Sequence, residues 1–138
     1  MQALIQALIS CISADAQLAE IFGSAPTVYL SEAPESANLP LVILRVGTGR
    51  VSHDFSGDRI TSVQLAFEII AADVNTALNA AQRLSALLDN TTLPLSTGSL
   101  LACTLAAPLQ PAMPGFNSLL NALYTAVVHL NCQVFNAA

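Results

Sequence analysis

The sequence predicts one α+β domain in which two main helices pack on one face of a mostly antiparallel sheet. Apolar residues recur at three- and four-residue steps in two segments, as on one face of a helix. Other segments alternate between apolar and polar residues, as in strands that are buried on one side. No helix-length segment separates most neighbouring strands, which favours antiparallel pairing. The 138 residues contain no repeat and no long linker, so residues 1–138 are predicted to form a single domain.

Both predicted helices have recognisable ends. The first spans about residues 2–22 and stops at Gly23, because glycine readily adopts the left-handed conformation that ends a helix. Within it, the stretch Ser13–Asp15 brings an acid into the apolar stripe, so two shorter helices are an alternative. The second spans about residues 74–89, with Asp73 as its expected N-cap. Its polar face is predicted to point outward and carries Asn75, Asn79, Gln82 and Arg83.

The predicted strands follow from apolar runs and period-two alternation. They cover about residues 27–30, 39–46, 59–71, 99–107 and 120–135, with a short edge segment at 93–95. The polar connector 47–58 contains three glycines, which predicts a hairpin with a long tip and a turn at Gly47–Gly49. Three prolines and a glycine predict that residues 108–117 form a loop.

The composition excludes several classes of protein. Hydrophobic residues make up 54% of the chain and charged residues only 9%, which argues against intrinsic disorder. Four arginines, no lysine and nine acids give a net charge of −5, whereas phosphate binding needs a basic patch. A surface with so few charges is poorly protected against association. The chain is therefore expected to work as a subunit of an assembly.

The apolar segments near the two termini suggest targeting or a membrane, but neither interpretation is favoured. Residues 8–11 resemble a bacterial lipoprotein box ending at Cys11, yet residues 1–10 contain no Lys or Arg, and a leader needs a basic start. Residues 90–138 carry no charge, but four prolines interrupt them, and a spanning helix needs about 20 mainly apolar residues. No membrane partner is expected.

No motif for catalysis, cofactor binding or metal binding is recognisable. The three cysteines have no paired spacing and are expected to be small buried thiols in a reducing compartment. His53 and Asp54 lie beside Ser52 and Ser56, but adjacent residues on a glycine-flanked loop do not hold a catalytic triad in register. The prediction is a protein that is not an enzyme and has no catalytic, cofactor-binding or metal-binding residues.

One cluster of charged residues suggests a contact surface. Three of the four arginines fall within fifteen residues, at and around the hairpin tip. The cluster either solvates an apolar protein or forms a mixed-charge interface with a partner subunit, because arginine favours interfaces through forked pairing. The candidate interface residues are Arg45, Arg50, His53, Asp54, Asp58 and Arg59.

The order of these segments resembles the tail terminator (tail completion) proteins of long-tailed bacteriophages. The resemblance covers most of the chain and depends on the order and spacing of several local strings: the helix Ala3–Ile12 with Phe22-Gly23, Leu39–Val42, the tip Gly47–Asp58, the strand Ser62–Ala71, the helix Asp73–Asp89 and the strand Tyr124–Phe135. The C-terminal third departs from the expected pattern because it lacks charged contact residues.

The resemblance implies a structural virion protein whose long hairpin has a mobile tip until assembly, with ring or tube contacts in Arg45–Arg59. Such a subunit would form a hexameric ring at the neck end of the virion tail, after assembly in the host cytoplasm. The ring would contact the tail tube protein, stop its polymerisation and join the tail to a neck or head completion protein. DNA would pass through its lumen without specific binding, and no cofactor would be needed. Alternatives are another neck or head-tail connector subunit and a small periplasmic or lipid-anchored binding protein.

Overall fold

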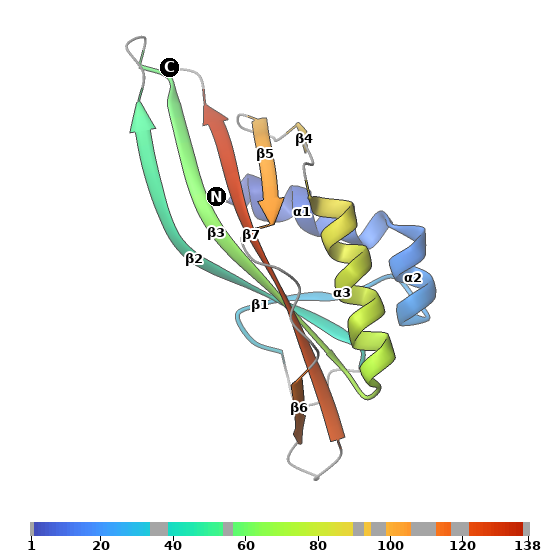
Figure 1. Cartoon of the computed structure of the whole chain (residues 1–138). Coiled ribbons are helices and arrows are strands. Elements are labelled where there is room, and N and C mark those ends of the chain that lie inside the picture. Colours follow the sequence, from blue (N-terminus) through green and yellow to red (C-terminus); the bar gives the residue numbers. More distant parts are fainter. Residues whose placement is uncertain are drawn as a thin grey trace.

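The computed structural model describes most of the chain: residues 2–33, 39–53, 57–89, 93–94, 99–105, 113–116 and 122–136. Within these residues, three helices lie together on one side of a long, curved sheet (Figure 1). The predicted α+β class, with a mostly antiparallel sheet and helices on one face, is confirmed.

The N-terminal apolar segment forms two helices, which confirms the alternative of two shorter ones. Helix α1 spans Gln2–Ala14 and helix α2 spans Ala16–Phe22, and their axes differ in direction by 71°. Asp15 separates them because its carboxylate accepts a hydrogen bond from the Leu18 backbone N–H at 2.9 Å, as an N-cap does. Gly23 ends α2 with a φ of 77°, the left-handed conformation expected of it.

Helix α3 spans Val74–Leu88 and begins where the sequence predicts. The Asp73 carboxylate accepts a hydrogen bond from the backbone N–H of Thr76 at 3.1 Å. The helix buries an apolar stripe against the sheet, made of Ala77, Ala80, Ala81, Leu84 and Leu88. Ser85 is also buried, and its hydroxyl donates to the Gln82 carbonyl, so its polar atom is satisfied.

Seven strands form one sheet in the described residues, in the order β1-β2-β3-β7-β5-β4, with β6 paired to β7. All pairs are antiparallel except β1 with β2. Their bounds are β1 Val28–Leu30, β2 Leu41–His53, β3 Arg59–Ala71, β4 Leu93–Pro94, β5 Ser99–Leu105, β6 Met113–Phe116 and β7 Ala122–Asn136.

The hairpin differs from its prediction at the glycines. Gly47–Gly49 lies inside β2 as an irregularity of the strand, where Val46 pairs with Leu65 and Gly49 already pairs with Val63. The predicted turn at this point is therefore wrong. A Cβ on Gly47 would lie 3.1 Å from the Gln64 carbonyl oxygen, so glycine serves close backbone approach in a bulge. β2 continues to His53, and residues 54–56 of the predicted tip lie outside the described residues.

The predicted loop at 108–117 is wrong in part. Met113–Phe116 forms β6, which pairs with the first half of β7. Proline is tolerated in a strand that pairs on only one side, which allows Pro114 here. Residues 108–112 and 117 of that predicted loop lie outside the described part of the chain.

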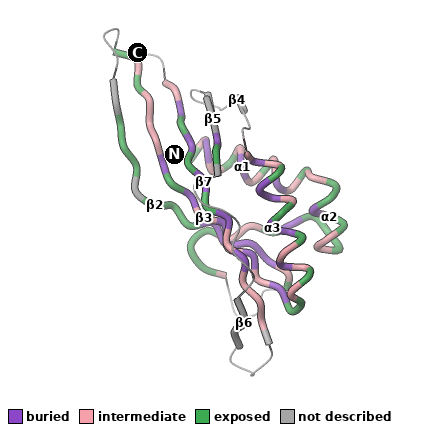
Figure 2. Tube along the Cα trace, in the orientation of Figure 1, coloured by how far each residue is buried: buried purple, intermediate pink, exposed green. Residues whose placement is uncertain are grey.

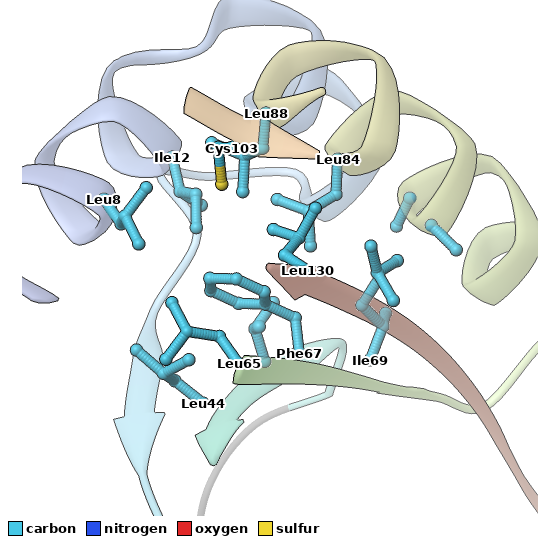
Figure 3. Close-up of a cluster of buried hydrophobic side chains, with 14 of the residues drawn as sticks. Leu8, Ile12, Leu44, Leu65, Phe67, Ile69, Leu84, Leu88, Cys103 and Leu130 are labelled. Atoms are coloured by element: carbon cyan, nitrogen blue, oxygen red, sulfur yellow. The ribbon is translucent and has the colours of Figure 1, made fainter. Parts of the chain in front are cut away.

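The core lies between the sheet and the three helices. β3 and β7 present their alternate residues to it, and Phe67 of β3 is completely buried among side chains from both layers (Figure 3). The fully buried large side chains are Leu4, Leu8, Ile12, Leu18, Leu44, Leu65, Phe67, Ile69, Leu84, Leu88 and Leu130. Figure 2 shows how these buried positions gather where the helices cover the strands.

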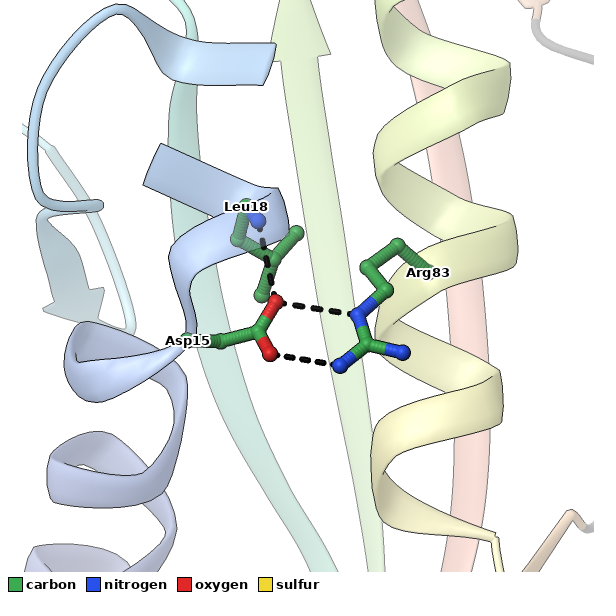
Figure 4. Close-up of polar contacts among 3 residues, drawn as sticks. All are labelled: Asp15, Leu18 and Arg83. Carbon is green, nitrogen blue, oxygen red and sulfur yellow. Dashed lines mark hydrogen bonds and ion pairs between the residues drawn. The ribbon is translucent and has the colours of Figure 1, made fainter. Parts of the chain in front are cut away.

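An ion pair connects the two helical segments. The Arg83 guanidinium of α3 donates to both carboxylate oxygens of Asp15, from Nε at 3.0 Å and from Nη2 at 2.6 Å (Figure 4). The Asp15 side chain is only 8% exposed. The hydrogen bonds from Arg83 hold the pKa of the Asp15 carboxyl below its ordinary value. Arg83 was predicted to face solvent. Its side chain is only partly exposed because it pairs with Asp15.

By length and composition, no single helix in the described residues could span a membrane. The bent pair α1 and α2 would pass that test only when taken together. In this fold its apolar face, including Leu4, Leu8 and Ile12, is buried in the core.

Candidate interaction surface

The β2–β3 hairpin carries the charged residues that the sequence identified. Arg45 and Arg50 lie on β2, and His53 ends β2 opposite Arg59, the first residue of β3. Asp58 directly precedes β3, while Asp54 lies outside the described residues. A strand rises about 3.3 Å per residue, so the backbone positions from Arg45 to His53 extend over roughly 25 Å of the hairpin. The structure therefore places them along an arm of the sheet and not together at one loop tip.

Arg45 has a partner within the same chain. Its Nε donates to Oε1 of Glu68 at 2.9 Å, and the two side chains are 52% and 25% exposed. The two residues lie diagonally across the β2–β3 pair, since Arg45 is opposite Ala66 and Glu68 is opposite Ile43. An exposed ion pair of this kind contributes about 0–1 kcal/mol to stability. Arg45 is therefore partly engaged in the hairpin, whereas Arg50 and Arg59 make no ion pair with any described residue.

The free edge of β2 is the most distinctive surface of the described chain. β1 pairs only with Val42–Leu44, so no described strand covers the outer edge of β2 from Arg45 to His53. In Figure 1 this part of β2 lies at the margin of the sheet, away from the helices. Natural proteins protect such edges with charged side chains (above all lysine), proline, a bulge or a covering segment. This strand has two arginines and a bulge but neither lysine nor proline, and no described segment covers it.

Exposed apolar side chains collect along the same margin. The large hydrophobic residues that are exposed in the described part of the chain all lie on β1, on β2 or just before β2: Leu30 at 53%, Leu39 at 38%, Val46 at 43% and Val51 at 52%. Val46 and Val51 lie on the uncovered part of β2, and we call these two residues the apolar row. Apolar side chains beside unpaired backbone groups and arginines have the composition of a protein-protein contact. Sequence reasoning identified the arginines here but not the apolar row. It placed Val51 in a loop, and the exposure of Val46 depends on which strands lie beside β2.

On the sheet face opposite the helices, the outer part of β2, β3 and β7 carries polar residues, and no described helix lies on it. Directly opposed residues share a face, so Arg50, Ser62 and Gln133 form one row across β2, β3 and β7. Gln64 with Asn131 forms the next row, and these residues line a depression of about 510 Å³. All its lining residues come from three adjacent strands, so it is a hollow in a sheet face and not an enclosed cleft.

The described side chains form no metal-binding cluster. No group of three or more His, Cys, Asp or Glu residues among them could hold a metal ion. His129 is exposed on the polar sheet face, opposite Ala66. The buried carboxylate of Asp15 is occupied by Arg83 and the α2 N-terminus. The chemistry of the surface is that of contact: backbone edge, aliphatic side chains and guanidinium groups.

Comparison with known proteins shows the fold. No protein-family model and no curated protein matches the sequence. The chain is similar to a chain of the solved structure described as the virion of a native gene transfer agent particle, with 22% identity and a TM-score of 0.69. The similarity covers 98% of this chain and 96% of that chain. The two chains therefore share their fold from end to end.

Proposed function

We propose that this chain is a structural subunit of a phage-like virion. The end-to-end similarity to a chain from a gene transfer agent virion supports this function. So does the surface chemistry, because the described residues offer a free strand edge and apolar side chains for packing against other subunits. The role is therefore non-enzymatic.

Within such a particle, the proposed role is that of a tail terminator. The chain would form a ring, of six copies as the resemblance implies, on the end of the tail tube. There it would stop tube polymerisation and present a surface to the neck or head protein. Each copy adds a net charge of −5, and an acidic lumen would repel DNA and let the genome pass without binding.

The free edge of β2 is the observation that carries this proposal. A ring needs a heterologous contact, in which one surface of each subunit meets a different surface of the next. An uncovered strand edge supplies backbone hydrogen-bond donors and acceptors, and Val46 and Val51 supply apolar area. Arg50 on the same strand is left for charge pairing with the tail tube. We assign the subunit contact to this edge.

Introducing charge on the free edge is expected to prevent ring formation without unfolding the subunit. In the double variant Val46→Lys/Val51→Lys, two ammonium groups would have to be desolvated in the contact, which disfavours association. Both side chains are about half exposed, so the melting temperature should change little. Sedimentation velocity at assembly concentration and negative-stain microscopy measure the rings, and circular dichroism measures the fold.

A matched control adds the same charge elsewhere. Gln82→Lys/Ala86→Lys places two lysines on the exposed surface of α3, away from the β2 edge. This variant should form rings as the unmodified chain does. If both variants form rings equally well, the contact lies on another surface. If the unmodified chain stays monomeric even with tube protein, the ring itself is refuted.

Removing charge near the end of the hairpin tests the contact with the tail tube. The double variant Arg50→Ala/Asp58→Ala should fold normally and form particles whose tails are overlong or uncapped, because the ring would no longer seat on the tube. Electron microscopy of particles from the producing cells measures tail length. Tails of normal length would place the tube contact elsewhere, and complete tails without heads would favour a connector role instead.

A further inference from the structure

Two cysteines that are distant in the sequence face each other in the sheet. Cys103 of β5 and Cys132 of β7 are direct cross-strand partners, 29 residues apart in the chain. Their sulfur atoms lie 2.8 Å apart, and both residues are completely buried as free thiols. The third cysteine, Cys11, is half-buried on α1 and is not part of this pair.

The backbone geometry at this point suits a covalent bond. Opposed residues of antiparallel strands have Cα atoms about 4.5–5.5 Å apart, which lies within the range of about 4.4–6.8 Å found in disulfides. A disulfide bond is about 2.05 Å long, so the sulfurs need to approach by less than about 1 Å. We propose that Cys103 and Cys132 form an oxidisable thiol pair, a modification site at which a disulfide joins β5 to β7.

The reaction needs a two-electron oxidant, for which a small-molecule disulfide suffices. The Cys103 thiolate attacks one sulfur of that disulfide, forming a mixed disulfide and releasing one thiolate. Cys132 then gives up its proton and attacks the Cys103 sulfur, which releases the second small thiol and leaves the protein disulfide. The hydrogen bond with Cys132 lowers the pKa of the Cys103 thiol, and the bond with Cys103 and burial raise that of Cys132.

Burial makes this reaction slow and its product persistent. Neither sulfur is open to solvent, so the oxidant gains access only when β5 separates locally from β7. A bond across a 29-residue separation restricts the unfolded chain, which is expected to raise the melting temperature by roughly 10 °C. The thiols would remain reduced in a reducing compartment and oxidise after the chain leaves it.

The purified full-length chain tests the proposal directly. The reduced protein is incubated with oxidised glutathione, and its intact mass, its thiols after unfolding and its melting temperature are measured. The expected product has lost two hydrogen atoms (about 2 Da). It retains one of the three free thiols, and a reducing agent reverses the change. Peptide mapping should recover Cys103 linked to Cys132.

Single variants identify the residues involved. Cys11→Ala should oxidise as the unmodified chain does, whereas Cys103→Ala and Cys132→Ala should not form the intramolecular bond. Three free thiols after prolonged oxidation of the unmodified protein would overturn the proposal. So would a stable glutathione adduct on Cys103, or a disulfide that includes Cys11. The measurements need no ring and no partner, so they stand or fall independently of the proposed virion role.

Discussion

Replacing Phe67 by alanine is expected to lower the free energy of unfolding by about 3–5 kcal/mol. Phe67 is completely buried at the centre of β3, between the sheet and the helices (Figure 3). Its ring is the largest fully buried side chain of the described core, and alanine would leave a cavity that the rigid sheet cannot close. A domain with a typical stability of about 5–15 kcal/mol would lose a large part of it.

Urea denaturation followed by circular dichroism measures this loss. Phe135→Ala is the matched control, because the same residue type lies half-buried near the end of β7, on the face opposite the core. Its loss should be clearly smaller. If both variants lose the same free energy of unfolding, Phe67 is not at the centre of the hydrophobic core, and the helices do not pack against β3 as described.

Replacing Asp15 by alanine is expected to be the most damaging change of a charged residue. The variant loses an N-cap, which contributes about 1 kcal/mol, and in addition leaves Arg83 without its carboxylate. Asp73→Ala is the matched control, since Asp73 caps α3 in the same way but has no arginine on its carboxylate in the described residues. Thermal unfolding should show a larger decrease for Asp15→Ala than for Asp73→Ala.

Asp15→Asn separates the two contributions. Asparagine keeps one oxygen for the cap but places an NH2 group where the second carboxylate oxygen accepts from Arg83. This variant loses the charge and one of the two Arg83 hydrogen bonds, so its stability should fall between that of Asp15→Ala and that of the unmodified chain. Equal stability of Asp15→Asn and the unmodified chain would mean that the contact between the α1–α2 junction and α3 contributes nothing through charge.

The same ion pair makes stability depend on pH. The pKa of Asp15 is lowered in the folded state, mainly by hydrogen bonds from Arg83, relative to an ordinary value of 3.8. A group of this kind binds protons more readily in the unfolded chain, so its stabilisation is fully present above that value. It is lost progressively as the pH falls below about 4 toward the folded pKa. Between about pH 2 and 6, the free energy of unfolding of Asp15→Asn should therefore decrease less with falling pH than that of the unmodified chain. About 0.1 M salt in these experiments screens the surface charges.

Separate measurements of folding and of ring formation show whether the free edge of β2 stabilises the subunit itself or contacts a neighbouring copy. Core variants at Phe67 act on the subunit, whereas charged substitutions at Val46 and Val51 leave the core intact and act on association. If edge variants also unfolded the isolated chain, the edge would be part of the subunit's own packing. A stable monomer that no longer forms rings would be the result that assigns the edge to a neighbouring copy.

Local sequence patterns determined the helices and most strands. Asp15, Gly23 and Asp73 mark helix ends through their own side chain or backbone freedom, and these positions hold in the structure. Alternation in residues 59–71 and 120–135 predicted which side of β3 and β7 is buried, because the period of two is a property of the strand itself. The glycines at 47 and 49 led to the wrong prediction of a turn. Glycine occurs both in turns and in bulges, and here it allows the close backbone approach of a bulge.

Only the tertiary structure decided which residues meet. Arg83 and Asp15 are 68 residues apart, and Cys103 and Cys132 are 29 apart, so no local spacing indicates either contact. Likewise, the sequence identified the arginines of the hairpin but not the apolar row of the β2 edge, because exposure depends on which strands lie beside it. Periodicity is a local property of the chain, whereas strand order and register are set by how all segments bury their apolar faces together.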